Sequence, residues 1–105
     1  MSKLVLTEPL SFWGGLDPAS GEIVDRHHPQ CGESVAGRVL HMPGTRGSTS
    51  SPGALVDAIR QGSGPEKIVL PQADMTVLTA IFIARELYGI EVPVEINEEQ
   101  FSDTT

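Results

Sequence analysis

Residues 67–89 have the sequence KIVLPQADMTVLTAIFIARELYG. The change from a strand-like to a helix-like pattern of residues inside this stretch decides the fold. Lys67–Leu70 is a short continuous apolar run, which is typical of a buried strand. The residues after it predict a helix over Met75–Tyr88, with Asp74 as its N-cap and Gly89 as its stop signal. A strand followed at once by a capped helix is the repeating unit of α/β folds.

A similar unit precedes this stretch, and a further strand follows it. Pro52–Gln61 predicts a helix with its apolar residues on one stripe, with Ser51 as the N-cap and Gly62 as the C-terminal cap. Strands are predicted at Ser34–Met42 and Val92–Ile96. The order strand, helix, strand, helix, strand implies parallel pairing of the strands with right-handed crossovers.

The first part of the chain predicts β-structure. Short strands are expected at Lys3–Leu6, Leu10–Trp13 and Glu22–Val24, with turn residues at Asp17–Gly21. At 105 residues the chain is long enough for one hydrophobic core but not for two. We therefore expect a single α/β domain over residues 1–105, built in layers from a β-rich N-terminal half and a βαβαβ C-terminal half.

Composition and charge narrow the function classes. The net charge of −7 argues against nucleic acid or an anionic membrane as partner, because both need a basic surface. No apolar run approaches the ~20 residues that cross a bilayer, and the N-terminal MSKLVLTEPL lacks the long apolar segment of a signal peptide. The single cysteine, Cys31, cannot form an internal disulfide. These features predict a cytoplasmic protein.

The helix predicted at Met75–Tyr88 is apolar in nearly every direction. It has no charged residue between Asp74 and Arg85. A helix that is apolar all round is covered on all sides, whereas one sheet covers only one face. Two interpretations are open: small alanines are tolerated at the surface, or another polypeptide covers the rest of the helix.

Residues 42–55, MPGTRGSTSSPGAL, connect a predicted strand to a predicted helix. In α/β folds, ligands bind at the carboxyl ends of strands, where the next helix presents free backbone N–H groups. Gly44 and Gly47 allow positive φ angles, so that successive N–H groups can converge on an anion. Arg46 would add a bidentate partner for a carboxylate or phosphate. This pattern predicts an anion-binding loop.

Ser48 follows Gly47 directly and is the best candidate for chemistry in this loop. Convergent N–H donors and a helix N-terminus stabilise the oxyanion form of a hydroxyl group, so Ser48 would accept a proton from a ligand. Thr49 and Ser50 would hydrogen-bond the ligand. The alternative is a solvated loop that ends in an N-cap. Two known motifs do not apply, because the loop has neither the lysine of a Walker A phosphate-binding loop nor the G-x-S-x-G of a hydrolase.

The other candidates are weaker. His27, His28 and Cys31 are metal-ligand types, but no second pair completes a tetrahedral site, which favours a polar turn. His41 lies near the loop and could orient a ligand there. A structural role, with its hydrogen bonds satisfied inside the protein, is favoured. Asp74 follows a strand and lies at the same predicted sheet edge as Ser48, where it could contact a ligand. A role as helix N-cap is enough to account for an aspartate at this position.

The residues also resemble a known family. The sequence EPLSFWGGLDPASGEIVDRHHPQCGESVAGRVLHMPGTRGSTSS at residues 8–51, followed by a helix and KIVLPQAD, resembles the small subunit, or swivel domain, of the aconitase X family. The resemblance covers about Glu8 to Ile96. It is carried by Gly14-Gly15 with Asp17, SGEIVD, the pair HP, the run G-x-S-x-x-G-R-V-L, and RGS at residues 46–48.

The resemblance implies a swivelling β/β/α domain that works only against a larger subunit, as a heterodimer or a higher assembly. That large subunit would hold an iron–sulfur cluster and most of the substrate pocket, and this chain would bind no metal. The implied reaction is the dehydration of a hydroxy acid by a hydro-lyase, with Ser48 as the residue that abstracts the proton. Arg46, Gly47, Thr49 and Ser50 would contact the substrate.

One departure from the family pattern concerns arginine. Related aconitase-type enzymes carry G-x-G-S-S-R, with the arginine after the serines, whereas this chain has Pro52 there and Arg46 before. The segment TSSPGALVDAIR, residues 49–60, looks more like bacterial cis-3-hydroxy-L-proline dehydratases than like the archaeal enzymes that act on mevalonate 5-phosphate. Two other classes stay open: a non-catalytic anion-binding or regulatory module, and a structural subunit whose loop is only a cap.

Overall fold

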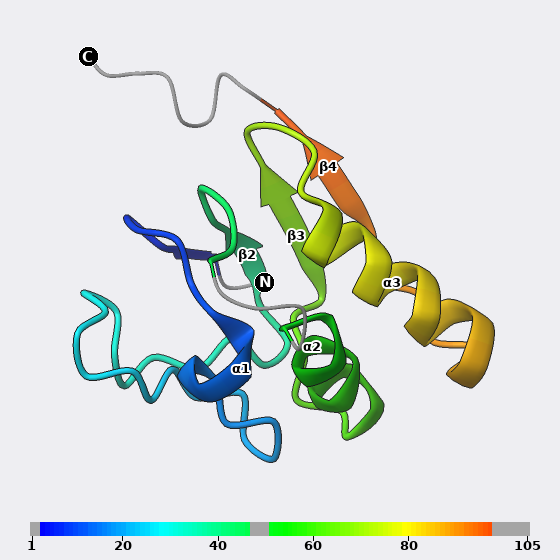
Figure 1. Cartoon of the computed structure of the whole chain (residues 1–105), viewed down its shortest axis with the longest axis horizontal. Helices are drawn as coiled ribbons and strands as arrows, with labels where there is room; N and C mark the ends of the chain where they lie inside the picture. Colours follow the sequence, from blue (N-terminus) through cyan, green and yellow to red (C-terminus); the bar gives the residue numbers. More distant parts are fainter. Residues whose placement is uncertain (1–2, 47–50, 98–105) are drawn as a thin grey trace.

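The computed structural model describes residues 3–46 and 51–97, with no side-chain description at Ser51 (Figure 1). Four parallel strands form one sheet in the order β1-β2-β3-β4. The strands are β1 (Lys3–Val5), β2 (Val39–His41), β3 (Lys67–Leu70) and β4 (Val94–Ile96), and the helices are α1 (Phe12–Gly15), α2 (Ser51–Arg60) and α3 (Met75–Tyr88). The predicted α/β class with parallel pairing is confirmed.

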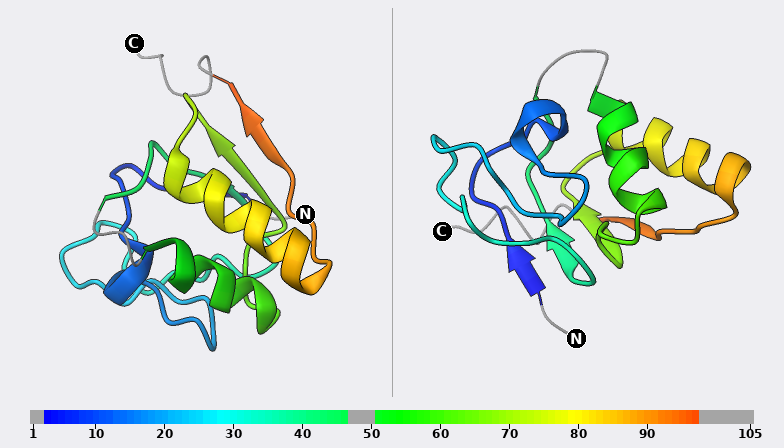
Figure 2. Two further views of the ribbon diagram at one scale, coloured as in Figure 1. Left: turned by 45° about the vertical axis from the view of Figure 1, so that its right-hand side comes forward. Right: turned by 90° about the horizontal axis from the view of Figure 1, so that it is seen from below.

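The two long helices lie on the same face of the sheet (Figure 2). The chain steps across the sheet in one direction through β2, α2, β3, α3 and β4, so successive crossovers of one hand place both helices on one side. Leu4, Leu40 and Ile68 are buried in the core that these helices cover, and they are partners in register. Side chains alternate along a strand, so His41 and Val69 belong to the opposite face.

One hydrophobic core joins the two halves of the chain. Its members come from the sheet, from α2 and α3, and from the segment between β1 and β2. The largest fully buried side chains are Leu6, Leu10, Phe12, Ile23, Val35, Leu40, Met42, Leu55, Ile68, Leu70 and Val77. Ile23 and Val35 show that the segment of loops before β2 packs as part of the core.

Helix α3 begins and ends where the sequence predicts. The Asp74 carboxylate accepts hydrogen bonds from the backbone N–H groups of Thr76 at 2.9 Å and Val77 at 3.2 Å. At the other end, Gly89 adopts φ 67°, and its N–H donates to the Arg85 carbonyl at 3.1 Å. These two caps fix the length of the helix.

The strand predicted at Leu10–Trp13 is wrong. Leu10 forms one isolated bridge to Thr45, and the chain then enters the short helix α1. Inside α1, Gly14 has φ +82°, a value that bends the chain away from an extended path and that other residues rarely adopt. The Ser11 hydroxyl donates to the Trp13 carbonyl at 2.9 Å and holds this bend.

Other predicted strands are shorter in the structure, and Lys3–Leu6 loses one residue to become β1. The strand expected over Ser34–Met42 is limited to β2, because Gly37 at φ +68° turns the chain and the Arg38 N–H bonds the Val35 carbonyl at 3.1 Å. Val92–Ile96 is limited to β4. The strand expected at Glu22–Val24 is reduced to isolated bridges, and so the N-terminal half has fewer regular strands than predicted.

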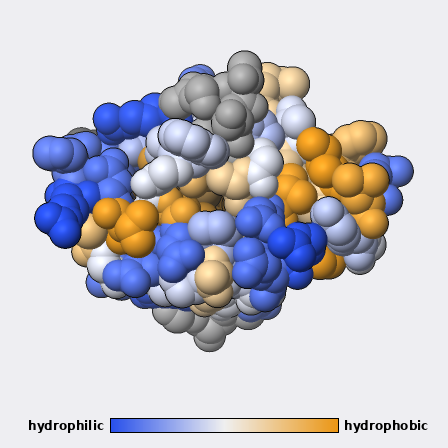
Figure 3. All heavy atoms as spheres, turned by 60° about the horizontal axis from the view of Figure 1, so that its bottom comes forward, coloured by the Kyte–Doolittle hydropathy of each residue, from blue (hydrophilic) through white to orange (hydrophobic). Residues whose placement is uncertain are grey.

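The described residues cover α3 on one side only. Val77, Ala80 and Ala84 are buried against the core, whereas Phe82 and Leu87 are 57% and 68% exposed. Figure 3 shows hydrophobic surface over α3, at the right of the view. Within the described ranges, no helix has both the length and the apolar character that a bilayer crossing requires.

Candidate active site

The segment between β2 and α2 starts at the carboxyl end of β2, at one edge of the parallel sheet (Figures 1 and 2). The predicted proton acceptor Ser48 lies outside the described residues, as do Gly47, Thr49 and Ser50. Their roles therefore stay predictions. The described part of this segment runs from Met42 to Arg46 and shows how the approach to the predicted site is held.

Asp74 anchors this segment to the start of α3. Its carboxylate accepts a hydrogen bond from the Thr45 backbone N–H at 2.9 Å and from the Thr45 hydroxyl at 2.9 and 3.0 Å. The same carboxylate caps α3. The predicted N-cap is confirmed, and the bond to Thr45 is a second role that sequence reasoning missed. Asp74 thus fixes the chain three residues before Ser48.

Arg46 is turned toward the N-terminal part of the chain. Its Nη2 donates to the Pro9 carbonyl at 3.3 Å and lies 3.6 Å from Glu8 Oε1. Both charged side chains are more than half exposed, so the ion pair contributes little to stability. The predicted contact between Arg46 and a substrate stays a prediction.

A second anchor joins the segment to the residues before α1. The Leu10 N–H donates to the Gly44 carbonyl at 3.3 Å, and the Arg46 N–H donates to the Leu10 carbonyl at 3.2 Å. Leu10 is fully buried, so this short parallel pairing is fixed in the core. It holds α1, which follows Leu10, beside the entrance to the predicted loop.

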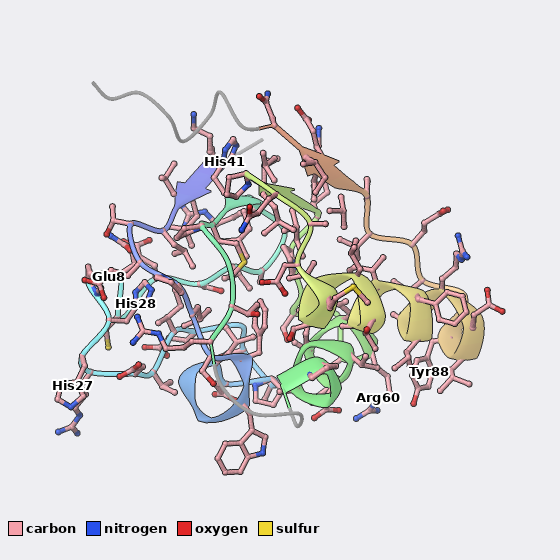
Figure 4. All side chains as sticks on the ribbon, turned by 45° about the horizontal axis from the view of Figure 1, so that its top comes forward. Glu8, His27, His28, His41, Arg60 and Tyr88 are labelled. Atoms are coloured by element: carbon pink, nitrogen blue, oxygen red, sulfur yellow. The ribbon has the colours of Figure 1, made fainter. Side chains whose placement is uncertain are left out.

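His41 is a buried residue at the end of β2. Burial lowers its pKa below the ordinary value of 6.5, and the nearby charges of Lys3 and Lys67 lower it further, against the raising effect of Glu95. Lys3 and Lys67 lie in the two strands that flank β2, and Glu95 lies in β4, one strand further away. Figure 4 shows His41 at the opposite end of the molecule from Arg60. Because it is buried among residues of the sheet, His41 fits the structural role that the sequence favours.

The lowered pKa of His41 predicts that the protein loses stability as the pH falls below about 6.5. Below that pH the imidazole binds a proton more readily in the unfolded chain than in the folded protein. The stabilisation is therefore present above that pH and is lost below it. Urea unfolding at pH 7.5, 6.5 and 5.5 measures the effect. His41→Gln should reduce this dependence, whereas His27→Gln, at an exposed position, should keep it. An unchanged dependence in His41→Gln would contradict the prediction.

The cluster of His27, His28 and Cys31 forms a turn. His28 is buried, its Nδ1 accepts the Gln30 N–H at 3.0 Å, and its Nε2 donates to the Glu8 carbonyl at 3.1 Å. His27 points outward, away from His28 (Figure 4). Over residues 3–46 and 51–97, no three His, Cys, Asp or Glu side chains come together to hold a metal ion. His28 ties the turn to the segment between β1 and α1, a role that sequence reasoning missed.

A family model supports the resemblance found in the sequence. The model of the aconitase X swivel domain matches residues 2–104.

Named relatives include separate subunits and longer chains. The chain is 40% identical over 94 residues to a cis-3-hydroxy-L-proline dehydratase of Pseudomonas aeruginosa, a match that covers 90% of this chain and 16% of that protein. It is 46% identical over 71 residues to a phosphomevalonate dehydratase small subunit of Methanopyrus kandleri, covering 68% of this chain and 53% of the relative. The chain therefore spans about half of one relative and a small part of the other.

A solved structure agrees with these matches. The holo-form of aconitase X from Thermococcus kodakaraensis superposes with a TM-score of 0.75 at 31% identity, covering 79% of this chain and 63% of that chain. Sequence, family model and fold thus agree: this chain belongs to the aconitase X swivel-domain family.

Proposed function

We propose that this chain is the small-subunit part of a hydro-lyase that dehydrates a hydroxy acid. The observation that carries the proposal is the match of 90% and 68% of the chain to two proteins named as dehydratases. The start of the segment between β2 and α2 at the carboxyl end of β2 supports it, because ligands bind at that edge in open α/β sheets.

Dehydration of a hydroxy acid needs a base for the proton and an acid for the leaving hydroxyl group. We assign the first task to Ser48, whose hydroxyl would be activated by backbone N–H donors at the start of α2. Gly47, Thr49 and Ser50 would hydrogen-bond the substrate, and Arg46 would contact its anionic group. Asp74 would hold the loop in place through Thr45.

The described residues do not fit an iron–sulfur cluster. Cysteine thiolates hold such clusters, and this chain has one cysteine, Cys31, in an exposed turn. We therefore assign no step to a metal held by this chain. The cluster and most of the substrate pocket would belong to a larger polypeptide, in keeping with the name "small subunit" of the M. kandleri relative.

The proposed substrate is cis-3-hydroxy-L-proline. The longer match is to the P. aeruginosa enzyme that is named for this substrate, and the segment at residues 49–60 looks like the bacterial type. Mevalonate 5-phosphate is the second candidate, because the M. kandleri relative has higher identity over a shorter match.

Reconstitution tests the proposal. The chain would be mixed with a cluster-loaded large subunit of an aconitase X-type dehydratase, and the consumption of cis-3-hydroxy-L-proline and of mevalonate 5-phosphate would be followed in parallel. Neither protein should turn over substrate alone, and the mixture should consume the first compound faster. Turnover of the second compound only would reassign the substrate. A chain that never associates, yet binds a small carboxylate by itself, would indicate an anion-binding module instead.

A further inference from the structure

A groove runs along α2, between this helix and α1, with a volume of about 710 Å³. Its floor consists of Phe12, Leu16 and Val56, all buried members of the core. The floor is therefore apolar and rigid. We call this surface the α1–α2 groove.

The rim of the α1–α2 groove carries the residue types that dominate binding energy at protein interfaces. Trp13 is 62% exposed on one side, and Tyr88 at the end of α3 is 46% exposed on the other. Arg60 stands beside Tyr88 where α2 ends (Figure 4) and pairs with Asp57. Trp, Tyr and Arg are enriched at interface hot spots, where an apolar pocket accepts a partner side chain.

The α1–α2 groove adjoins the predicted catalytic loop at both ends of that loop. The chain enters the loop through Thr45 and Arg46, which are held against Leu10, just before α1. It leaves the loop in the first turn of α2, where Gly53 and Ala54 line the groove. The α1–α2 groove therefore lies beside the described residues on either side of the predicted loop.

The relatives indicate which polypeptide would contact the α1–α2 groove. The same domain is a separate small subunit in the M. kandleri relative and a minor part of a longer chain in the P. aeruginosa relative. Most of that longer chain lies outside the matched part, so a surface that faces it would be left open in a domain described alone. The net charge of −7 favours a partner with a basic contact surface.

We propose that the α1–α2 groove is the docking surface for the larger polypeptide of the dehydratase, with Trp13 as its main anchor. This inference rests on the proposed function, because it identifies the face by which the partner of the catalytic loop is held. The occupant is a segment of that polypeptide with an apolar side chain that reaches the floor beneath Trp13 and Tyr88.

Binding measurements with matched variants test the inference. The probe is the cluster-loaded large subunit of an aconitase X-type dehydratase, titrated with the whole chain by calorimetry. Trp13→Ala should raise the dissociation constant by about tenfold or more, which is the scale of a hot-spot truncation. Tyr88→Ala, on a different element, should raise it by about fivefold. Both side chains are exposed, so the melting temperature should stay within about 2 °C of wild type.

Phe82→Ala is the matched control. Phe82 is also a large aromatic residue and is nearly as exposed as Trp13, but it lines a separate hollow between α3 and the residues before β4. Its replacement should change the dissociation constant by less than about twofold. A larger effect from Phe82→Ala than from Trp13→Ala would overturn the inference and assign the partner to the outer side of α3.

Three further results separate docking from its rivals. Full turnover by Trp13→Ala at a saturating concentration of the large subunit would support docking, because only the affinity for that subunit is then lost. Lower turnover at saturation with unchanged affinity would overturn the inference and make Trp13 a substrate contact. A dimer of this chain that Trp13→Ala abolishes would assign the groove to a second copy. If the wild-type chain itself neither binds nor activates the large subunit, it is the proposed function that fails.

Discussion

Replacing Ser48 by alanine is expected to lower turnover by the assembled enzyme about 10²–10⁴-fold, which is the usual contribution of a positioned base. The change removes the proposed proton acceptor and leaves every described contact of the chain in place. Affinity for the large subunit should therefore stay within about twofold of wild type. Single-turnover consumption of cis-3-hydroxy-L-proline at saturating concentrations of both proteins measures the chemical step alone.

Ser50→Ala is the control for this experiment. Ser50 is predicted to hydrogen-bond the substrate without taking its proton, and so its loss should raise KM by about fivefold, in line with one neutral hydrogen bond. The rate at saturating substrate should change little. Turnover retained by Ser48→Ala would remove Ser48 from the mechanism. Equal losses in the two variants would show that the loop only binds.

Replacing Asp74 by alanine is expected to have the largest effect on stability among the described polar residues. The variant loses the cap of α3 and leaves the Thr45 N–H and hydroxyl without their partner. A lost N-cap costs about 1 kcal/mol, and each unsatisfied partly buried group adds about 1 kcal/mol. Urea unfolding should show a loss of about 2–3 kcal/mol.

Thr45→Val separates the two roles of Asp74. It removes the hydroxyl bond to the Asp74 carboxylate and keeps the α3 cap, so it should cost about 1 kcal/mol. In a double-mutant cycle the two changes should be non-additive by about 1 kcal/mol, because they share an interaction. Asp57→Asn, at a half-exposed ion pair on α2, should cost less than about 0.5 kcal/mol. An Asp74→Ala variant as stable as Asp57→Asn would refute the anchor.

The sequence predicts well where local signals decide. Asp74 and Gly89 bound α3 because a capping carboxylate and a glycine with positive φ act within a few residues of the chain. Lys67–Leu70 becomes β3 without change, because a short apolar run between turns has few alternatives in a small core.

Prediction fails where distant residues decide. Leu10–Trp13 has strand-forming residues, but the single bridge to Thr45 and the bend at Gly14 override that preference. The bond between Asp74 and Thr45 spans 29 residues, and the bond between His28 and the Glu8 carbonyl spans 20. No periodicity or capping rule relates residues that far apart, so only the folded chain reveals these anchors.

The parallel order of the sheet has a consequence for protein engineering. Lys3 opens the first edge strand and Ile96 closes the last, so the described ends are separated by three strand spacings, about 14 Å, as well as by the length of a strand. A peptide that joins these two strand ends, as in a circular permutant, would have to span this distance. The two strand ends also point to opposite edges of the sheet: Ile96 ends at the carboxyl edge, where the site is proposed, and Lys3 starts at the amino edge.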